Sequence, residues 1–349
     1  MTLGFLSKSA SWIPMTWVRP VSGVGLVVPY YHMVSDAHVP HVSHLYKFRS
    51  TREFTADLEF FLRHFDPLTL SDVVEILNGP QGRRRPGFHL TFDDGFREMH
   101  EIVVPILDRY GISGTFFLNT AFLDGGGLAH HNVLGLCVDR LRTREGKSSG
   151  AVLQRLEEIL PAAREGSEGL PQRILSIPRE DAARVHSVVE LLGCDVGQYI
   201  REEQPYLSSE QVRSMLAKGF SIGSHSHDHP HYKDLTLAEQ VEQTRASMNM
   251  LDEKFRMSPR AFAFPHNDTG VTLNFFARVF AELSLDVSFG TGGLAPHFYP
   301  RNIERVKMEG TSASARQILT RQFARAAYFR ARGRLAGSAN RNANAEASA

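Results

Sequence analysis

The sequence has few of the features that mark disulfide-stabilised or membrane-spanning proteins. Two cysteines, Cys137 and Cys194, among 349 residues exclude a fold that several disulfides hold together, although a single bridge stays open. We favour two free thiols in a reducing compartment. No apolar run reaches the length that a membrane span requires.

The chain also has almost no excess of positive over negative charge. The formal net charge is +1 at pH 7, so no strong overall field favours nucleic acid or an anionic membrane. Residues 1–24 form a mildly apolar N-terminal extension. They lack the ordered basic region, apolar stretch and cleavage site of a signal peptide, which predicts a cytoplasmic protein.

Short apolar runs alternate with helical patterns along most of the chain. We predict strands at 25–31, 87–92, 114–118, 221–223, 261–264 and 286–289. We predict helices at 51–65, 72–79 with Ser71 as its cap, 97–110, 208–218, 236–255 and 272–282. Strands that alternate with helices indicate an α/β fold with a parallel sheet and helical crossovers.

Two regions depart from this alternation. Residues 125–205 are richer in charge and in helix formers, and we interpret them as a helical insertion. Residues 311–335 predict a basic C-terminal helix, and 336–349 lack large apolar side chains and are expected to be disordered. The basic helix would suit nucleic acid or a membrane surface. Packing on the main domain is the interpretation we favour, with no nucleic-acid partner and the oligomeric state open.

Asp93, Asp94 and Gly95 follow the predicted strand at 87–92. Sites in parallel α/β folds are built at such carboxyl ends of strands. Two adjacent carboxylates repel each other unless a cation or a proton lies between them. A metal would let one carboxylate bind while the other accepts a proton from bound water. The alternative is a plain polar turn, in which Gly95 eases the bend.

Four histidines alternate at 225, 227, 229 and 231. Pro230 argues against a continuous paired strand, so a loop in which only some of the rings converge is expected. Neutral imidazoles suit zinc and related metals, and two of them with one carboxylate leave positions open for water and substrate. A polar surface loop that binds metal only adventitiously is the alternative.

The Thr-Phe-Asp-Asp-Gly motif and the later His-Ser-x-x-His-Pro motif together resemble the NodB-like polysaccharide deacetylases, carbohydrate esterase family four. The resemblance implies a distorted, TIM-like (β/α)7 barrel over residues 25–310. It also implies that Asp93 is the catalytic base and that Ser226 braces the loop. The implied metal ligands are Asp94, His225 and His229.

Weaker motifs extend the resemblance toward the members that act on exopolysaccharides. They are Tyr30–Asp36, the Phe-Ala-Phe-Pro sequence at 262–265, Ser288–Gly293 and Arg301–Val306. They suggest substrate-binding or supporting roles for His32, Phe264, Pro265 and Arg305. Core packing is nevertheless the reading we favour for the rings of Phe262 and Phe264.

The sequence departs from the family pattern at two places. Ala263 stands where many members carry an arginine that positions the base, and Arg260 or Arg305 could replace it. The Leu-x-His motif that supplies the family's catalytic acid is not evident. The candidates for that acid are His297, His266 and His32.

The resemblance implies a hydrolase of non-peptide carbon–nitrogen bonds. It would remove the N-acetyl group of an amino sugar in a polysaccharide, oligosaccharide or glycan precursor, and its divalent metal would be zinc. Two other functions stay open. One is a glycan-binding protein that has lost the chemistry, and the other is a barrel hydrolase that acts on a different amide or ester.

Overall fold

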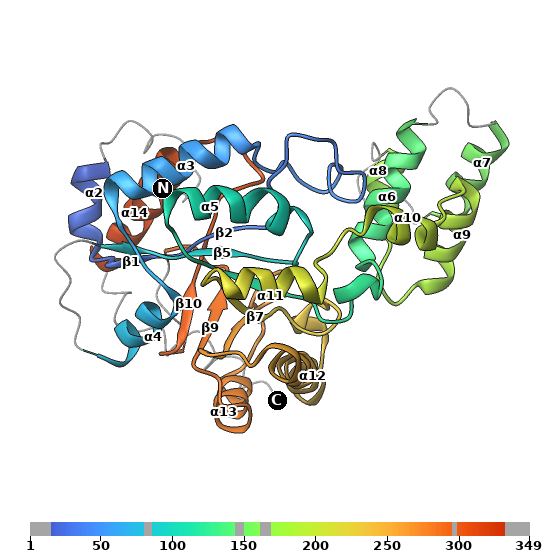
Figure 1. Ribbon diagram of the computed structural model, residues 1–349. Helices are drawn as coiled ribbons and strands as arrows, with labels where there is room; N and C mark the ends of the chain where they lie inside the picture. Colours follow the sequence, from blue (N-terminus) through green and yellow to red (C-terminus); the bar gives the residue numbers. More distant parts are fainter. Residues whose placement is uncertain (1–14, 80–85, 144–149, 161–168, 295–298, 332–349) are drawn as a thin grey trace.

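A parallel sheet forms the centre of the molecule (Figure 1). The strand order is β10-β9-β8-β7-β6-β5-β2-β11. The strands are β2 (Pro29–Tyr31), β5 (Leu90–Phe92), β6 (Gly114–Leu118), β7 (Ser221–Ser224), β8 (Ala261–Ala263), β9 (Val287–Gly290), β10 (Asn302–Glu304) and β11 (Val306–Lys307). This computed structural model describes residues 15–79, 86–143, 150–160, 169–294 and 299–331.

The chain closes this sheet into a barrel through one segment, residues 302–307. Its first half, β10, pairs with β9, and its second half, β11, pairs with β2 at the other edge. Among the described residues, seven stretches of chain thus supply the eight labelled strands. The prediction of a distorted (β/α)7 barrel is confirmed. Arg305 lies between the two halves, at the point of closure.

A small second sheet extends the barrel beyond the amino ends of β2 and β5. Its strands, in the order β1-β4-β3, are β1 (Leu26–Val27), β4 (Gly87–Phe88) and β3 (Asp66–Pro67). The apolar runs predicted as single strands at 25–31 and 87–92 are therefore each divided in two. Most of their residues are buried because both faces of the sheet are covered.

Helices surround the barrel (Figure 1). They are α3 (Thr51–His64), α4 (Leu70–Asn78), α5 (Val104–Tyr110), α11 (Ser209–Ala217), α12 (Leu237–Phe255) and α13 (Leu273–Glu282). The prediction that Ser71 caps α4 is wrong. Thr69 is the cap, because its hydroxyl accepts the amide hydrogen of Asp72 while the Asp72 carboxylate accepts that of Thr69. The helix expected at 97–110 begins with a π-helical turn, Met99–Val103.

The segment between β6 and α11 carries further helices, which stand to one side of the barrel (Figure 1). They are α6 (His130–Thr143), α7 (Gly150–Ile159), α8 (Leu170–Leu175), α9 (Ala182–Leu192) and α10 (Val196–Glu203). Their apolar faces enclose a separate core that includes Leu134, Leu156 and Val188. Cys137 is buried in this core, and neither it nor Cys194 forms a disulfide.

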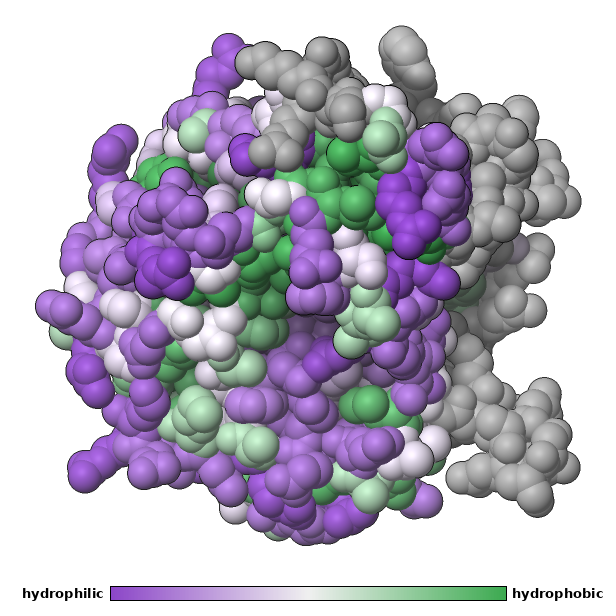
Figure 2. Space-filling model, turned by 90° about the vertical axis from the view of Figure 1, so that its right-hand side faces the viewer, coloured by the Kyte–Doolittle hydropathy of each residue, from purple (hydrophilic) through white to green (hydrophobic). Residues whose placement is uncertain are grey.

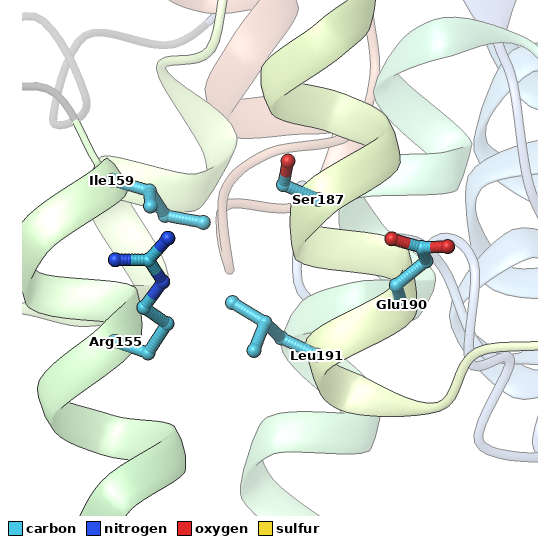
Figure 3. Close-up of a pocket in the computed structure, with 5 residues that line it drawn as sticks. All are labelled: Arg155, Ile159, Ser187, Glu190 and Leu191. Atoms are coloured by element: carbon cyan, nitrogen blue, oxygen red, sulfur yellow. The ribbon is translucent and has the colours of Figure 1, made fainter.

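A shallow groove opens between the outer helices of this insertion (Figure 3). Arg155 and Ile159 line it from α7, and Ser187, Glu190 and Leu191 line it from α9. The surface seen from this side is largely hydrophilic, with hydrophobic residues gathered in the upper middle of the view (Figure 2). The groove lies on helices that carry none of the site residues expected from the sequence.

The basic helix near the C-terminus, α14 (Ala315–Ala331), packs against α2 (Met15–Ser22) and α3. Its buried side includes Leu319 and Phe323, and the Phe323 ring stacks on Phe65 at 6.3 Å. This helix packs on the main domain, as the interpretation favoured from the sequence predicts. Residues 332–349, which include the tail expected to be disordered, lie outside the described residues. No helix within the described ranges is long and apolar enough to cross a membrane.

Candidate metal centre

The acidic pair and the histidine loop meet at the carboxyl edge of the barrel. Asp93 directly follows β5 and His225 directly follows β7, with β6 between them. The amide of Asp93 donates to the carbonyl of Tyr31 (2.9 Å), and that of His225 donates to the carbonyl of Leu118 (2.9 Å). The strand ladders therefore continue one residue further and hold both side chains at the same edge.

Asp94, His225 and His229 bring three donor atoms together. Asp94 Oδ1 lies 3.2 Å from His229 Nε2 and 3.6 Å from His225 Nε2, and all three side chains are buried. Asp94 Oδ1 and His225 Nε2 make no well-aligned hydrogen bond with any described residue. Buried polar atoms without partners are rare, so these atoms fit a bound cation. A carboxylate and two imidazoles are a donor set that zinc uses.

The neighbours of His225 leave its Nε2 free to bind. Its Nδ1 lies 2.9 Å from the carbonyl oxygen of Ala263, so Nδ1 carries the hydrogen and Nε2 keeps its lone pair. Burial lowers the pKa of His225 to about 4 and keeps the ring neutral. His229 and His32 hold the pKa of Asp94 well below its usual value against the effect of burial.

The backbone around these residues is strained. Asp94, Ser226 and His229 have φ values of 69°, 70° and 62°, in the left-handed region that non-glycine residues rarely adopt. Ser226 stabilises the loop, because its hydroxyl accepts the amide hydrogen of His229 at 3.1 Å. Gly95, with φ 71°, has no space for a Cβ, which would lie 2.9 Å from Leu118. Strain concentrated in this way is typical of functional sites.

Asp93 pairs with Arg305 beside the three donors, and its Oδ2 lies 4.0 Å from His225 Nε2. Asp93 and Arg305 form a double hydrogen bond, with Nη1 to Oδ1 at 2.6 Å and Nη2 to Oδ2 at 2.7 Å, and both are almost fully buried. Arg305 also donates to Thr91 and lies over the ring of Tyr30. Burial alone would raise the pKa of Asp93, but Arg305 and His225 hold it below its usual value.

Of the two arginines considered as replacements for Ala263, only Arg305 reaches Asp93. Arg260 binds Asp252 at 2.7 Å and the carbonyl of Leu283 at 3.0 Å. The last segment of the barrel thus contributes the guanidinium.

His32 follows β2 and forms an ion pair with Glu309, a residue that the sequence did not single out. His32 Nδ1 contacts one Glu309 oxygen, and the other oxygen accepts the amide hydrogens of His32 (3.1 Å) and Met33 (3.4 Å). Burial favours the neutral ring, but Glu309, Asp94 and Asp93 outweigh it and raise the pKa of His32 to about 9. Only the position of Glu309, four residues after Arg305, could have suggested it.

A family model described as polysaccharide deacetylase matches residues 81–150 and 181–279. The chain belongs to the polysaccharide deacetylase family. The matched ranges contain Asp93, Asp94, His225 and His229. The gap between them, residues 151–180, falls within the insertion.

Several solved structures have the deacetylase fold of this chain. The deacetylase PplD of Streptococcus pyogenes, in complex with acetate, has a TM-score of 0.53 and 14% identity, covering 86% of this chain and 98% of its own. IcaB from Ammonifex degensii has a TM-score of 0.52 and 17% identity, and the match covers 86% of this chain and 98% of its own. A de-N-acetylase from Aggregatibacter actinomycetemcomitans has a TM-score of 0.50 and 15% identity, and the match covers 84% of this chain and 99% of its own. A search of curated proteins finds no match.

The other histidines near the candidate metal centre do not join the three donors. His227 Nδ1 lies 2.9 Å from the hydroxyl of Thr120, and His231 stacks on His266 at 3.5 Å between ring centroids. His266, one candidate acid, is exposed at the rim, 4.3 Å from the His229 ring. His297, another candidate, lies outside the described residues.

His131 of α6 also lies beside the site, and sequence reasoning missed it. Its ring centroid is 4.9 Å from that of His229, so the insertion contributes to the wall of the candidate metal centre. Burial lowers the pKa of His131 to about 3, and His229 adds to the effect. The sequence offered no signal, because the contact depends on how the insertion folds back on the barrel.

Phe264 and Pro265 directly follow β8, and both are buried. Phe264 is fully buried, with its ring 4.8 Å from Phe262 and 5.5 Å from Tyr232. Pro265 is buried as well, where the chain leaves β8. The prediction that Phe262 and Phe264 pack in the core is confirmed.

Proposed function

We propose that this chain is a divalent-metal-dependent N-deacetylase that hydrolyses the acetamido group of an amino sugar within a glycan. One observation carries the proposal. Asp93, held as a carboxylate by Arg305, lies next to three convergent donors that have two unpartnered buried atoms. Membership of the polysaccharide deacetylase family supports the same conclusion.

Asp94, His225 and His229 would hold the metal, and their donor types favour zinc. A divalent ion held by this set would polarise a carbonyl oxygen and would lower the pKa of water toward neutrality. Ser226 keeps the loop closed so that the His229 ring stays near Asp94.

Asp93 is the general base in this proposal. A base must be deprotonated before it can accept a proton, and the guanidinium of Arg305 favours the carboxylate form. The double hydrogen bond also fixes the orientation of the carboxylate. Asp93 then accepts the proton of the water that attacks the amide carbon.

His32 is the general acid in this proposal. Glu309 occupies Nδ1 and favours the charged ring, so Nε2 carries the proton that the departing amine needs. This assignment would account for the absence of the Leu-x-His motif, because the histidine after β2 takes the role of the acid. His32 follows β2 and Asp93 follows its neighbour β5, so the assignment is supported by their position at the same edge of the barrel.

Acetate release from an N-acetylglucosamine oligosaccharide tests the proposal. The zinc-loaded protein should release acetate, and Asp93→Asn should keep its metal while turnover falls by about 10² to 10⁴, the usual contribution of a general base. Asp234→Asn, an exposed carboxylate just after the loop, is the matched control and should retain turnover.

Two results would favour the other functions. Oligosaccharide binding without acetate release by the metal-loaded protein would indicate a glycan-binding protein. Hydrolysis of simple esters or other amides, with the N-acetylated oligosaccharide left intact, would indicate a different hydrolase. Full turnover by Asp93→Asn would contradict the role of Asp93 as base.

A further inference from the structure

A second cluster of metal-ligand side chains lies outside the candidate centre. His38 and His44 belong to the segment between β2 and α3, and Asp139 belongs to α6 of the insertion. Asp139 Oδ1 lies 2.5 Å from His38 Nε2 and 3.0 Å from His44 Nε2. The three donor atoms lie within 4.8 Å of one another.

This cluster repeats the arrangement at Asp94. In both places one carboxylate oxygen faces the Nε2 atoms of two histidines, and the donors come from segments far apart in the chain. Asp139 and His44 have side chains that are only 14% exposed, whereas His38 is 55% exposed. An ion can therefore enter from solvent on the His38 side, and water can complete its coordination.

The backbone around the cluster is fixed before any ion binds. Asn132 Nδ2 donates to the carbonyl of His41 at 3.0 Å. Gly135 lets the two backbones approach, because a Cβ there would lie 2.7 Å from the same carbonyl oxygen. Asn132, Gly135 and Asp139 lie on one face of α6. The β2–α3 loop therefore packs along this face of α6, and the His38–His44–Asp139 cluster lies at the end of the contact.

We propose that His38, His44 and Asp139 form a second divalent-cation site, of the zinc type, that clamps the β2–α3 loop to the insertion. The clamp would act at a distance on the candidate centre. The β2–α3 loop begins next to His32, and α6 contains His131, which contacts His229. The contact between this loop and α6 therefore affects residues on both sides of the candidate centre. The proposal does not rest on the proposed function.

Metal content of the purified full-length protein tests the proposal. After removal of metal by a chelator and reloading with Zn²⁺, the wild type should hold two equivalents. His44→Ala and Asp139→Asn should each hold one, and His229→Ala should also hold one. The matched control is His186→Ala on α9, an exposed histidine 3.3 Å from Glu190, which should keep two.

Thermal unfolding gives a second measurement that does not involve activity. A ligand that binds the folded state raises the unfolding midpoint, so Zn²⁺ should still raise it in His229→Ala. The double variant His229→Ala/His44→Ala should show no such rise. Equal metal content in wild type, His44→Ala and Asp139→Asn would overturn the proposal. That result would mean that the cluster is only a pair of histidine–carboxylate hydrogen bonds.

Discussion

On one side of the acidic pair lie Arg305, His32 and Glu309, and on the other lie His225 and His229. The first side pairs every charge. Arg305 binds Asp93 through two hydrogen bonds, and Glu309 binds the side chain and backbone of His32. On the second side, buried donor atoms are left without well-aligned partners among the described residues.

The difference separates two tasks within one site. Paired charges fix protonation states, because each partner favours the charged form of the other. Unpaired donors are costly in a folded protein unless a ligand completes them. The paired side therefore suits proton transfer, and the unpaired side suits a cation. Substitutions on each side should therefore produce different defects.

The largest effect is expected on the unpaired side. Asp94→Ala removes the shared carboxylate oxygen, so the protein should lose the zinc equivalent of the candidate centre and its deacetylation rate should fall by about a thousandfold or more. Metal analysis and acetate release measure the two changes. Asp228→Ala is the control, because Asp228 lies in the same loop but pairs with Arg179. A zinc content of Asp94→Ala equal to that of the wild type would contradict the division between the two sides.

On the paired side, Arg305→Met should destabilise the fold by about 3–5 kcal/mol, because it leaves the Asp93 carboxylate buried without its partner. Chemical denaturation measures this loss. Arg260→Met breaks a partly exposed ion pair with Asp252 and should cost about 1 kcal/mol or less. Equal destabilisation by the two variants would show that the buried Asp93–Arg305 pair contributes no more to stability than the partly exposed pair.

Arg305→Lys sharpens the same point through the pH profile. Lysine keeps the charge but loses the double hydrogen bond, so the pKa of Asp93 should rise. Because Asp93 acts as a carboxylate, the acid limb of kcat/KM should then move to higher pH. An unchanged acid limb would indicate that another group controls it.

The ion pair of His32 and Glu309 predicts a dependence of stability on pH. The pKa of His32 is about 9 in the folded protein and near 6.5 when unfolded, so folding favours the protonated ring. The resulting stability is fully present below pH 6.5 and is lost as pH rises through 9, by up to about 3 kcal/mol. Denaturation of the metal-free protein between pH 6 and 10 measures it.

Glu309→Gln should flatten this dependence, because the carboxylate that favours the charged ring is gone. The exposed His186→Gln is the control and should keep the slope of the wild type. A slope that survives in Glu309→Gln would assign the effect to other groups.

The sequence was sufficient for the residues that strand geometry brings together. Asp93 and Asp94 end one apolar run, and His225 follows another. Because parallel strands end at the same edge of a sheet, these residues could be expected to meet. The barrel itself followed from the alternation of strands and helices with the family resemblance.

The sequence was insufficient where long-range closure or local backbone geometry decides. Glu309 meets His32 only because residues 302–307 close the barrel, which no local pattern encodes. The spacing of the histidines alone did not choose between His227 and His229. The family resemblance named His229, and left-handed backbone at Ser226 and His229 accompanies its position in the structure. Thr69 replaces Ser71 as a helix cap because two nearby hydroxyls offer the same local signal.

The smallest effect is expected at Ser226, whose hydroxyl accepts the amide hydrogen of His229. Ser226→Ala should weaken zinc binding about fivefold, the equivalent of one hydrogen bond of about 1 kcal/mol. Ser226→Gly also removes the hydroxyl but accommodates φ 70° without strain. If both variants lose affinity equally, the hydroxyl organises the unpaired side of the site. If only Ser226→Ala does, the backbone conformation is the controlling feature, and the hydrogen bond is incidental to metal binding.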